Sequence, residues 1–328
     1  MKGSWRFLCF LILLLLPING YTWGFYAHQR INRLAVFALP PEMVGFYKKH
    51  IRYITENAVN PDRRRYAVEG EAPRHYIDLD MYGDSALHKL PRFWQPAVEQ
   101  LTEDTLMAYG IVPWHINFMK YQLTEAFKER NLDKILRISS DLGHYVADAC
   151  VPLHTTSNYN GQFTGQRGIH GFWESRLPEL FSDQYDFFVG QAQYLEQPQL
   201  TAWSLVASAH TALDSVLQVE RELTLEFDEE KKYGFEPRNN ITTRVYSRQF
   251  SEAYNRKLNG QVERQMRLAI KAVASFWYTA WVDAGQPNLG TLATKLTPEE
   301  LYLLEMEKKG FDTGPHKLRD ENDNLDHE

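Results

Sequence analysis

The sequence predicts an all-α fold, built as one mostly helical domain. Two segments carry apolar residues at clear helical spacing. They are Leu132, Ile135, Ile138, Leu142, Tyr145 and Ala149 in one segment, and Val262, Met266, Ala269, Val273, Trp277 and Ala280 in the other. No internal repeat and no series of alternating strands is present. The 328 residues, 44% hydrophobic and 24% charged, have the composition of an ordinary globular protein.

The first 22 residues are expected to be a secretory signal peptide. Lys2 and Arg6 give a basic start, and residues 8–19 form an apolar run that Pro17 interrupts. This run is too short to span a bilayer comfortably, and small residues follow it near a cleavage point. A retained N-terminal anchor helix is the alternative. The pattern predicts an exported protein, periplasmic or secreted, whose mature chain begins at Trp23.

The rest of the chain is expected to form one domain over 23–297, followed by a charged tail over 298–328 that is a short helix with a disordered end. Asn131 and Pro152 are the start and stop signals of the helix between them. Further helical patterns cover residues 26–38, 41–56, 114–130 and 200–223. Only the stretch RHYIDLDMY, at 74–82, looks extended.

Charge and cysteine content limit the possible functions. The formal net charge is −6, and removal of Lys2 and Arg6 with the signal would make it −8. An acidic chain is not expected to grip nucleic acid tightly, because such binding depends on many phosphate contacts. Cys9 would leave with the signal, so Cys150 would stand alone. An exported chain without disulfides is stabilised by its core, by bound metal, or by both.

Histidine–acid pairs are concentrated in one part of the sequence. About 1.4 pairs at i,i+4 spacing are expected by chance, and the spacing brings side chains together only in a helix. The chain has four such pairs, and two of them, His144/Asp148 and His170/Glu174, fall within 31 residues together with His154. Each pair leaves one helix face, and Pro152 ends the helix so that His154 can turn back. Nitrogen and oxygen ligands from two helices, without a thiolate, predict a zinc site.

Features upstream fit the same site. His75 lies in the segment expected to be extended, and Asp62 in a loop before it. A mature chain that starts at Trp23 would offer a free α-amine and its carbonyl as a chelating pair, with His28 five residues further on.

This set of residues resembles the zinc-dependent phospholipase C family, which shares a fold with the single-strand-specific zinc-dependent nucleases. The resemblance covers residues 23 to 285 and rests on nine positions in order. They are Trp23, His28, Asp62, His75, His144, Asp148, His154, His170 and Glu174.

The resemblance implies three Zn²⁺ ions and hydrolysis of phosphodiester bonds. The first zinc would be held by Asp62, His75, His144 and Asp148. The second would be held by His154, His170 and Glu174. The third would be held by the Trp23 amine and carbonyl with His28, and Asp148 would bridge it to the first. Such ions lower the pKa of a water and neutralise charge on phosphoryl oxygens. Asp62 would orient this water or accept its proton, or would serve only as a ligand.

The substrate stays open between a phospholipid and single-stranded nucleic acid. Glu174 matches the phospholipase, whereas the nucleases usually carry aspartate there. The spacing from Trp23 to His28 is nuclease-like, and Arg63 and Ala72 stand where the phospholipase has aromatic choline-binding residues. The sequence therefore favours a phospholipase C-like phosphodiesterase with an unassigned head group and transient contact with a membrane surface, and a nuclease or nucleotidase is the alternative.

Two further interpretations follow from the residues alone. Arg63 and Arg74 belong to a basic group that could bind a substrate phosphate, and a solvated basic loop is the other interpretation. A non-catalytic, zinc-stabilised binding module of the cell envelope is a different class of function. Structural zinc sites have four protein ligands each, whereas the second and third proposed sites have fewer from their own residues, which favours catalysis.

Overall fold

The structure is a computed structural model, and it describes residues 24–65, 67–238 and 241–292. Over these residues the chain is mostly helical, with one two-stranded sheet, which confirms the all-α prediction. The α-helices are α1 (Phe25–Ala35), α2 (Pro41–Lys49), α3 (Ile51–Glu56), α4 (Asn60–Arg64), α5 (Ala86–Lys89), α6 (Trp94–Leu101), α7 (Glu103–Tyr109), α8 (Val112–Lys128), α9 (Leu132–Asp148), α10 (Ile169–Gly171), α11 (Leu177–Phe181), α12 (Pro198–Glu226), α13 (Glu229–Lys232), α14 (Arg248–Lys257) and α15 (Gln261–Asp283).

Shorter turns join these helices. The 3₁₀ turns are η1 (Val36–Ala38), η2 (Ala72–His75), η3 (Leu79–Tyr82), η4 (Pro152–Thr155), η6 (Ser182–Gln184) and η7 (Leu289–Thr291), and η5 (Phe172–Arg176) is a π-helical turn. The strands β1 (Tyr233–Arg238) and β2 (Ile241–Tyr246) pair antiparallel, with Tyr233 opposite Tyr246.

Helix α9 lies at the centre of the core and carries part of the candidate site. The side chain of Asn131 caps it by accepting a hydrogen bond from the backbone N–H of Lys134 at 3.1 Å. Every residue from Ser139 to Asp148 is buried. Ser139 is tied to both neighbours: its hydroxyl lies 2.8 Å from the Tyr47 hydroxyl, and its carbonyl accepts from the Trp277 indole at 2.9 Å.

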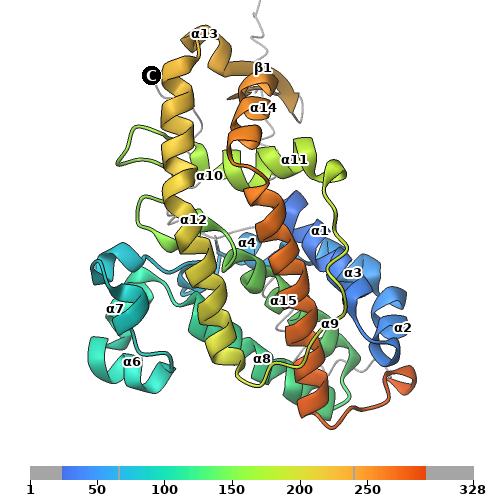
Figure 1. Cartoon of the computed structure of the whole chain (residues 1–328). Coiled ribbons are helices and arrows are strands. Elements are labelled where there is room, and N and C mark those ends of the chain that lie inside the picture. Colours follow the sequence, from blue (N-terminus) through green and yellow to red (C-terminus); the bar gives the residue numbers. More distant parts are fainter. Residues whose placement is uncertain (1–23, 66, 239–240, 293–328) are drawn as a thin grey trace, which may run out of the picture.

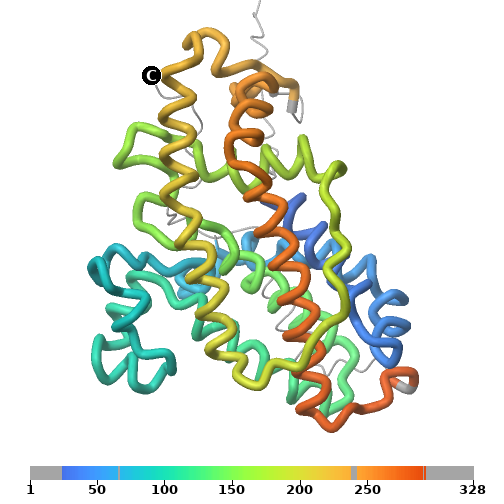
Figure 2. Tube along the Cα trace, viewed as in Figure 1, coloured from blue at the N-terminus to red at the C-terminus, as the bar shows by residue number. Residues whose placement is uncertain are grey.

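The long helices α12 and α15 run along the molecule; α8 packs against both of them, and α9 packs against α15 (Figure 1). Helix α1 packs on α15, α3 and α9, so the start of the described chain lies beside its C-terminal helix (Figure 2). The core between these helices is aromatic and aliphatic, and Trp277 is its largest fully buried side chain. Core packing thus brings α1, α9 and α15 together, although they are far apart in the sequence.

The predicted helical segments are confirmed, with one break. The segment 26–38 is α1 followed by η1, 114–130 is α8, and 200–223 lies within α12. The segment 41–56 divides at His50 into α2 and α3.

The extended segment predicted at 74–82 is wrong for most of its length. Two 3₁₀ turns, η2 and η3, occupy both ends, and Tyr76 between them has extended dihedral angles. Neighbouring backbone explains this, because Ile77 and Asp78 donate their N–H groups to the carbonyls of His154 and Tyr109 instead of to a strand.

Three expectations fall outside the described residues: the signal peptide over 1–22, Trp23, and the charged tail over 298–328. Within the described part of the chain, none of the helices combines the length and the apolar character needed to cross a membrane.

Candidate metal centre

The structure brings eight of the nine predicted ligands into three adjoining groups that could hold metal ions. In each group the ligand atoms lie within 4.8 Å of one another. The α1 group is His28, His144 and Asp148; the central group is Asp62, His75 and His144; the turn group is His154, His170 and Glu174. The ninth predicted ligand, Trp23, lies outside the described residues.

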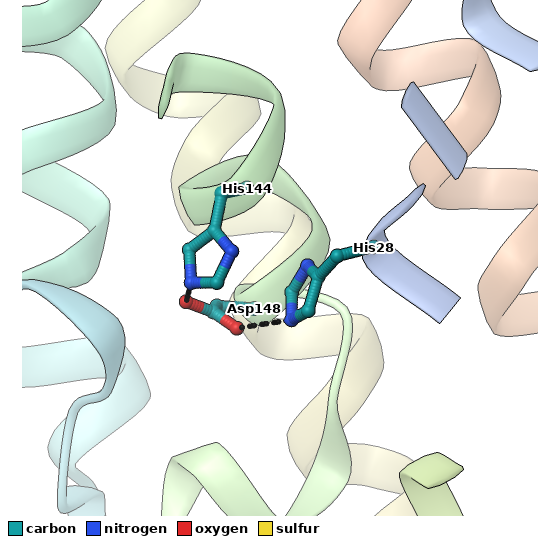
Figure 3. Close-up of side chains that lie close together, drawn as sticks. All are labelled: His28, His144 and Asp148. Carbon is teal, nitrogen blue, oxygen red and sulfur yellow. Dashed lines mark ion pairs between the residues drawn. The ribbon is translucent and has the colours of Figure 1, made fainter. Parts of the chain in front are cut away.

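The α1 group joins two helices (Figure 3). Asp148 contacts both histidines through its two carboxylate oxygens. His28 Nε2 lies 3.3 Å from Oδ1, and His144 Nε2 lies 3.1 Å from Oδ2. The two imidazole rings are stacked with centroids 3.9 Å apart. Because His144 and Asp148 are one turn apart on α9, their side chains leave the same face, as the spacing predicts.

A glycine permits this close approach of α1 to α9. A Cβ atom at Gly143 would stand 2.1 Å from Oδ1 of Asn32, whose amide donates to the carbonyl of Ser140 at 3.0 Å. Asn32 is one helical turn from His28 on α1. The glycine next to His144 therefore lets α1 pack closely enough to place His28 over the His144 ring.

The central group adds residues from two short elements. His75 Nδ1 lies 2.9 Å from Asp148 Oδ2 and 3.0 Å from His144 Nε2, and Asp62 Oδ1 lies 3.5 Å from the same His144 nitrogen. Asp62 lies in the first turn of α4, so the prediction of a loop is wrong. Pro61 at the start of α4 favours a helix there, because its fixed φ suits the first turn.

The turn group is built without a long helix. His170 Nε2 lies 3.0 Å from both Glu174 Oε2 and His154 Nε2. His170 and Glu174 are spaced by four residues, but the chain between them passes from α10 into the π-helical turn η5, which the sequence did not predict. The turn group adjoins the others through Asp148, whose Oδ1 lies 3.5 Å from His154 Nδ1.

Backbone carbonyls orient two of the imidazole rings. His144 Nδ1 lies 2.8 Å from the carbonyl oxygen of Ala58, and His154 Nδ1 lies 2.9 Å from that of His75. With a proton on each of these Nδ1 atoms, the lone pair of each Nε2 is directed toward the ligand groups. This is the arrangement that a histidine metal ligand requires.

The buried carboxylate oxygens and facing imidazole nitrogens of the site favour a bound cation. Asp148 Oδ1 and Glu174 Oε2 are buried and receive no hydrogen bond from the described residues. Two pairs of imidazole nitrogens face each other at 3.0 Å, in His144/His75 and His154/His170. Lone pairs this close repel unless a proton or a metal ion lies between them. The residues present therefore fit a site for metal ions with nitrogen and oxygen ligands.

The pKa values show the same demand for positive charge. Burial alone would lower the pKa of His144, but the carboxylates of Asp148 and Asp62 outweigh it and raise that pKa to about 9. Burial would raise the pKa of Asp148, yet the neighbouring His144 and His154 hold it well below its usual range. In the absence of a metal ion the acids thus retain a proton on the imidazole.

The predicted phosphate-binding arginines have different surroundings. Arg63 lies over the ring of Phe25, with its Cζ 5.5 Å from the ring centroid. Arg74 donates to Glu71 Oε2 at 2.6 Å, and its side chain is 35% exposed. Arg64 is buried and pairs with Asp141 at 3.0 Å, so it does not belong to a solvated basic loop. Arg65 is also buried, and its Nη1 lies 3.6 Å from Asp62 Oδ1.

Sequence reasoning missed the polar residues that hold the chain around the turn group. Asp80 accepts hydrogen bonds from the backbone N–H and hydroxyl of Ser157, at 2.9 and 2.6 Å, and from the Thr156 hydroxyl. Asn160 Oδ1 accepts from the backbone N–H groups of Gly168 and His170. Each of these contacts joins residues distant in sequence or lies within an irregular loop, so the helical or strand periodicity of the sequence does not predict it.

Comparison with known proteins adds no assignment. No family model matches the chain, and no curated protein matches it either.

Proposed function

We propose that this protein is a zinc-dependent phosphodiesterase with three Zn²⁺ ions. The observation that carries the proposal is the adjacency of the three groups. The α1 group and the central group share His144, and Asp148 links the turn group to them through His154. Buried clusters that only stabilise a fold have no need of contiguous sites. Adjacent metal ions suit a reaction in which several phosphoryl oxygens must be neutralised at once.

Most residues of the three groups would bind the metal ions, and one carboxylate would also orient a water molecule or accept its proton. Bound zinc would lower the pKa of a water molecule and neutralise charge on the phosphate. Asp62 is among the more exposed ligands, with 13% of its side chain accessible, whereas Asp148 is 1% exposed. Of the two carboxylates in the α1 and central groups, Asp62 is therefore the one that substrate and solvent can reach, and we assign it to orienting water or accepting its proton.

The α1 group shares His144 with the central group, and its Asp148 also lies 2.9 Å from His75 of the central group, so His28 is the one ligand that serves the α1 group alone. Gly24 supports completion of the α1 group by the start of the mature chain. A Cβ at Gly24 would stand 2.9 Å from Glu174 Oε1, and Gly24 lines a cavity together with His28 and Glu174. The residue that precedes Gly24 in the sequence is Trp23, so a free amine there would start at the edge of the site. A tag left in front of Trp23 is expected to cripple activity, and full activity with such a tag would remove this part of the proposal.

A phospholipase C-like activity is the preferred assignment of substrate. Two exposed apolar side chains, Met81 (46% exposed) and Phe163 (73%), belong to the segments that follow His75 and His154. Asp80, next to Met81, is bonded to Ser157, so the two segments are joined beside the site. Such side chains suit transient contact with a lipid surface. Hydrolysis of single-stranded nucleic acid is the alternative, and Arg63 beside Phe25 would then hold a phosphate near a base.

The test is a substrate panel on purified protein that has been treated with chelator and reloaded with zinc. Phospholipid vesicles, a soluble short-chain phospholipid and single-stranded oligonucleotides separate the substrate classes. We expect hydrolysis of phospholipid that is lost with chelator and restored by zinc. The double variant M81S/F163S is expected to lose activity on vesicles while it retains activity on the soluble lipid.

The same panel separates catalysis from zinc-stabilised binding. A binding module would lose stability with chelator but would hydrolyse none of the diesters. Zinc binding without turnover on any substrate would therefore contradict the enzyme assignment and leave the binding module standing.

A further inference from the structure

A network of buried charges lies directly behind the central group. Its central member is Glu71, which is fully buried (0% exposed) on the segment just before His75. The carboxylate of Glu71 accepts hydrogen bonds from the Tyr145 hydroxyl and from Arg74 Nη1, and Arg64 Nη2 lies 3.6 Å away. Glu71 is therefore a carboxylate fixed from three sides.

The open side of Glu71 faces His75. Nδ1 of His75 points to the metal groups, where Asp148 Oδ2 lies at 2.9 Å. Nε2 of the same ring points the opposite way, and Glu71 Oε1 lies 3.8 Å from it. This Nε2 is buried and has no hydrogen-bond partner among the described residues, so the carboxylate of Glu71 is the charge that it faces.

We propose that Glu71 is a positioning residue for the metal centre, which acts through His75. Its negative charge favours a proton on His75 Nε2, and that tautomer leaves the Nδ1 lone pair free for a cation. In His144 and His154, a backbone carbonyl oxygen favours a proton on the ring nitrogen that faces away from the ligand groups. In His75, the charged side chain of Glu71 has this role. The inference rests on the proposed metal centre and assigns a residue that no ligand pattern contains.

The network also supplies a matched control. Asp141 is a second buried carboxylate that pairs with Arg64, at 3.0 and 3.4 Å, and it is 4% exposed. Asp141 and Glu71 thus balance the charge of the same arginine, but only Glu71 faces a histidine of the metal centre. A comparison of E71Q with D141N separates the orientation of His75 from a general change of charge behind the site.

The experiment measures zinc affinity by competition with a chromophoric chelator, on wild type, E71Q and D141N. We expect E71Q to bind the zinc of the central group about 10- to 100-fold less tightly, the usual effect of removing a carboxylate behind a histidine ligand. D141N is expected to bind zinc as wild type does. Visible absorption of the Co²⁺-loaded proteins is the second measurement, and E71Q but not D141N should show an altered spectrum.

The outcomes are distinct. Wild-type zinc affinity and an unchanged Co²⁺ spectrum in E71Q would overturn the role of Glu71, and so would an equal loss in D141N. If E71Q does not fold, E71D is the second variant: it keeps the negative charge, but its side chain is one methylene shorter, so the carboxylate lies further from His75. Undiminished zinc affinity in E71D would overturn the role as well. A wild-type protein that binds no zinc would instead contradict the proposed function.

Discussion

The helix side and the turn side of the candidate metal centre are built in different ways. The helix side, which comprises the α1 group and the central group, rests on α9, whose ligands His144 and Asp148 are at most 1% exposed. The turn side is the turn group, in which Glu174 is 16% exposed and stands on the π-helical turn η5. Packing between long helices fixes the first, whereas the second stands on short turns that combine buried side chains, such as Phe172 of η5, with single polar contacts.

This difference has a consequence for mutations. A change on the helix side disturbs packed helices and two groups at once, because His144 belongs to both. A change on the turn side removes one polar contact and affects one group. Fold stability and metal binding should therefore be coupled on the helix side and separable on the turn side.

The largest effect is expected from removal of the shared histidine. His144→Ala should lose zinc from two groups, and activity should fall by at least about a thousandfold, since metal ions contribute several kcal/mol of transition-state stabilisation. His170→Ala should lose zinc from one group only. Elemental analysis of the two purified variants measures this, and equal zinc loss in both would contradict the shared role of His144.

Two glycines beside ligands sharpen the comparison further. Gly143→Ala should lower the free energy of unfolding by about 1–3 kcal/mol, because the new methyl meets the buried Asn32 side chain. Gly171→Ala is the control, since a Cβ there has no neighbour within 4 Å. It should change stability by less than about 0.5 kcal/mol. Denaturant unfolding gives both values, and a neutral Gly143→Ala would refute the close approach of α1 to α9.

Acid should weaken the helix side through His115, whose ring lies edge-on to Tyr145 of α9 at 4.5 Å. Burial, with a smaller contribution from the charge of Arg74, lowers the pKa of His115 to about 3. The unfolded chain takes up a proton below its ordinary pKa of about 6.5, whereas the folded chain does not, so stability is lost as the pH falls below that value.

Between pH 6.5 and pH 5 the loss due to His115 should be about 1.6 kcal/mol. Denaturant unfolding at both pH values, on wild type and on His115→Phe, isolates this contribution. On going from pH 6.5 to pH 5, wild type should lose that much more free energy of unfolding than His115→Phe does. An unchanged difference would show that His115 is accessible to protons in the folded state.

The smallest effect is expected on the turn side, at the ion pair that holds η5 to β1. Arg176 is 4% exposed and pairs with Glu236 at 2.5 and 2.7 Å, but Glu236 is 40% exposed and its charge is screened by solvent. Glu236→Gln should therefore cost no more than about 1 kcal/mol of stability. Glu252→Gln, in the exposed pair with Arg248, is the control and should cost about 0.3–0.5 kcal/mol.

The ion pair with Arg176 also bears on metal binding, because Arg176 is two residues from Glu174. Glu236→Gln should weaken zinc binding by the turn group by a few fold, whereas Glu252→Gln should leave it unchanged. Competition with a chelator measures both. A loss of zinc from the helix side in Glu236→Gln would contradict the independence of the two sides.

The sequence predicted those parts of the molecule that repeat. Helices α9 and α15 follow from the spacing of their apolar residues, and the pair His144/Asp148 follows from one turn of α9. The pair His170/Glu174 also meets, but across α10 and the π-helical turn η5, which the sequence did not predict. The hairpin β1–β2 was missed, although the run of β-branched and aromatic residues over 241–246 was a signal for a strand.

Long-range contacts escaped prediction for a physical reason. Glu71 and Tyr145 are 74 residues apart, and Asp80 and Ser157 are 77 apart. Such pairs are specified by how the packed elements meet, and neither partner has a periodic neighbour that reveals it. Asp62, His75 and His28 were recognised as features that fit the site and were assigned to particular zinc ions by resemblance to a family, and the structure brings all three to ligands on α9.

The central claim is that the three groups together hold three zinc ions. Elemental analysis of the purified protein, after chelation and reloading with zinc, tests it most directly. The account predicts three zinc ions per chain, of which two depend on His144. A protein that retains less than one zinc per chain after reloading would contradict it.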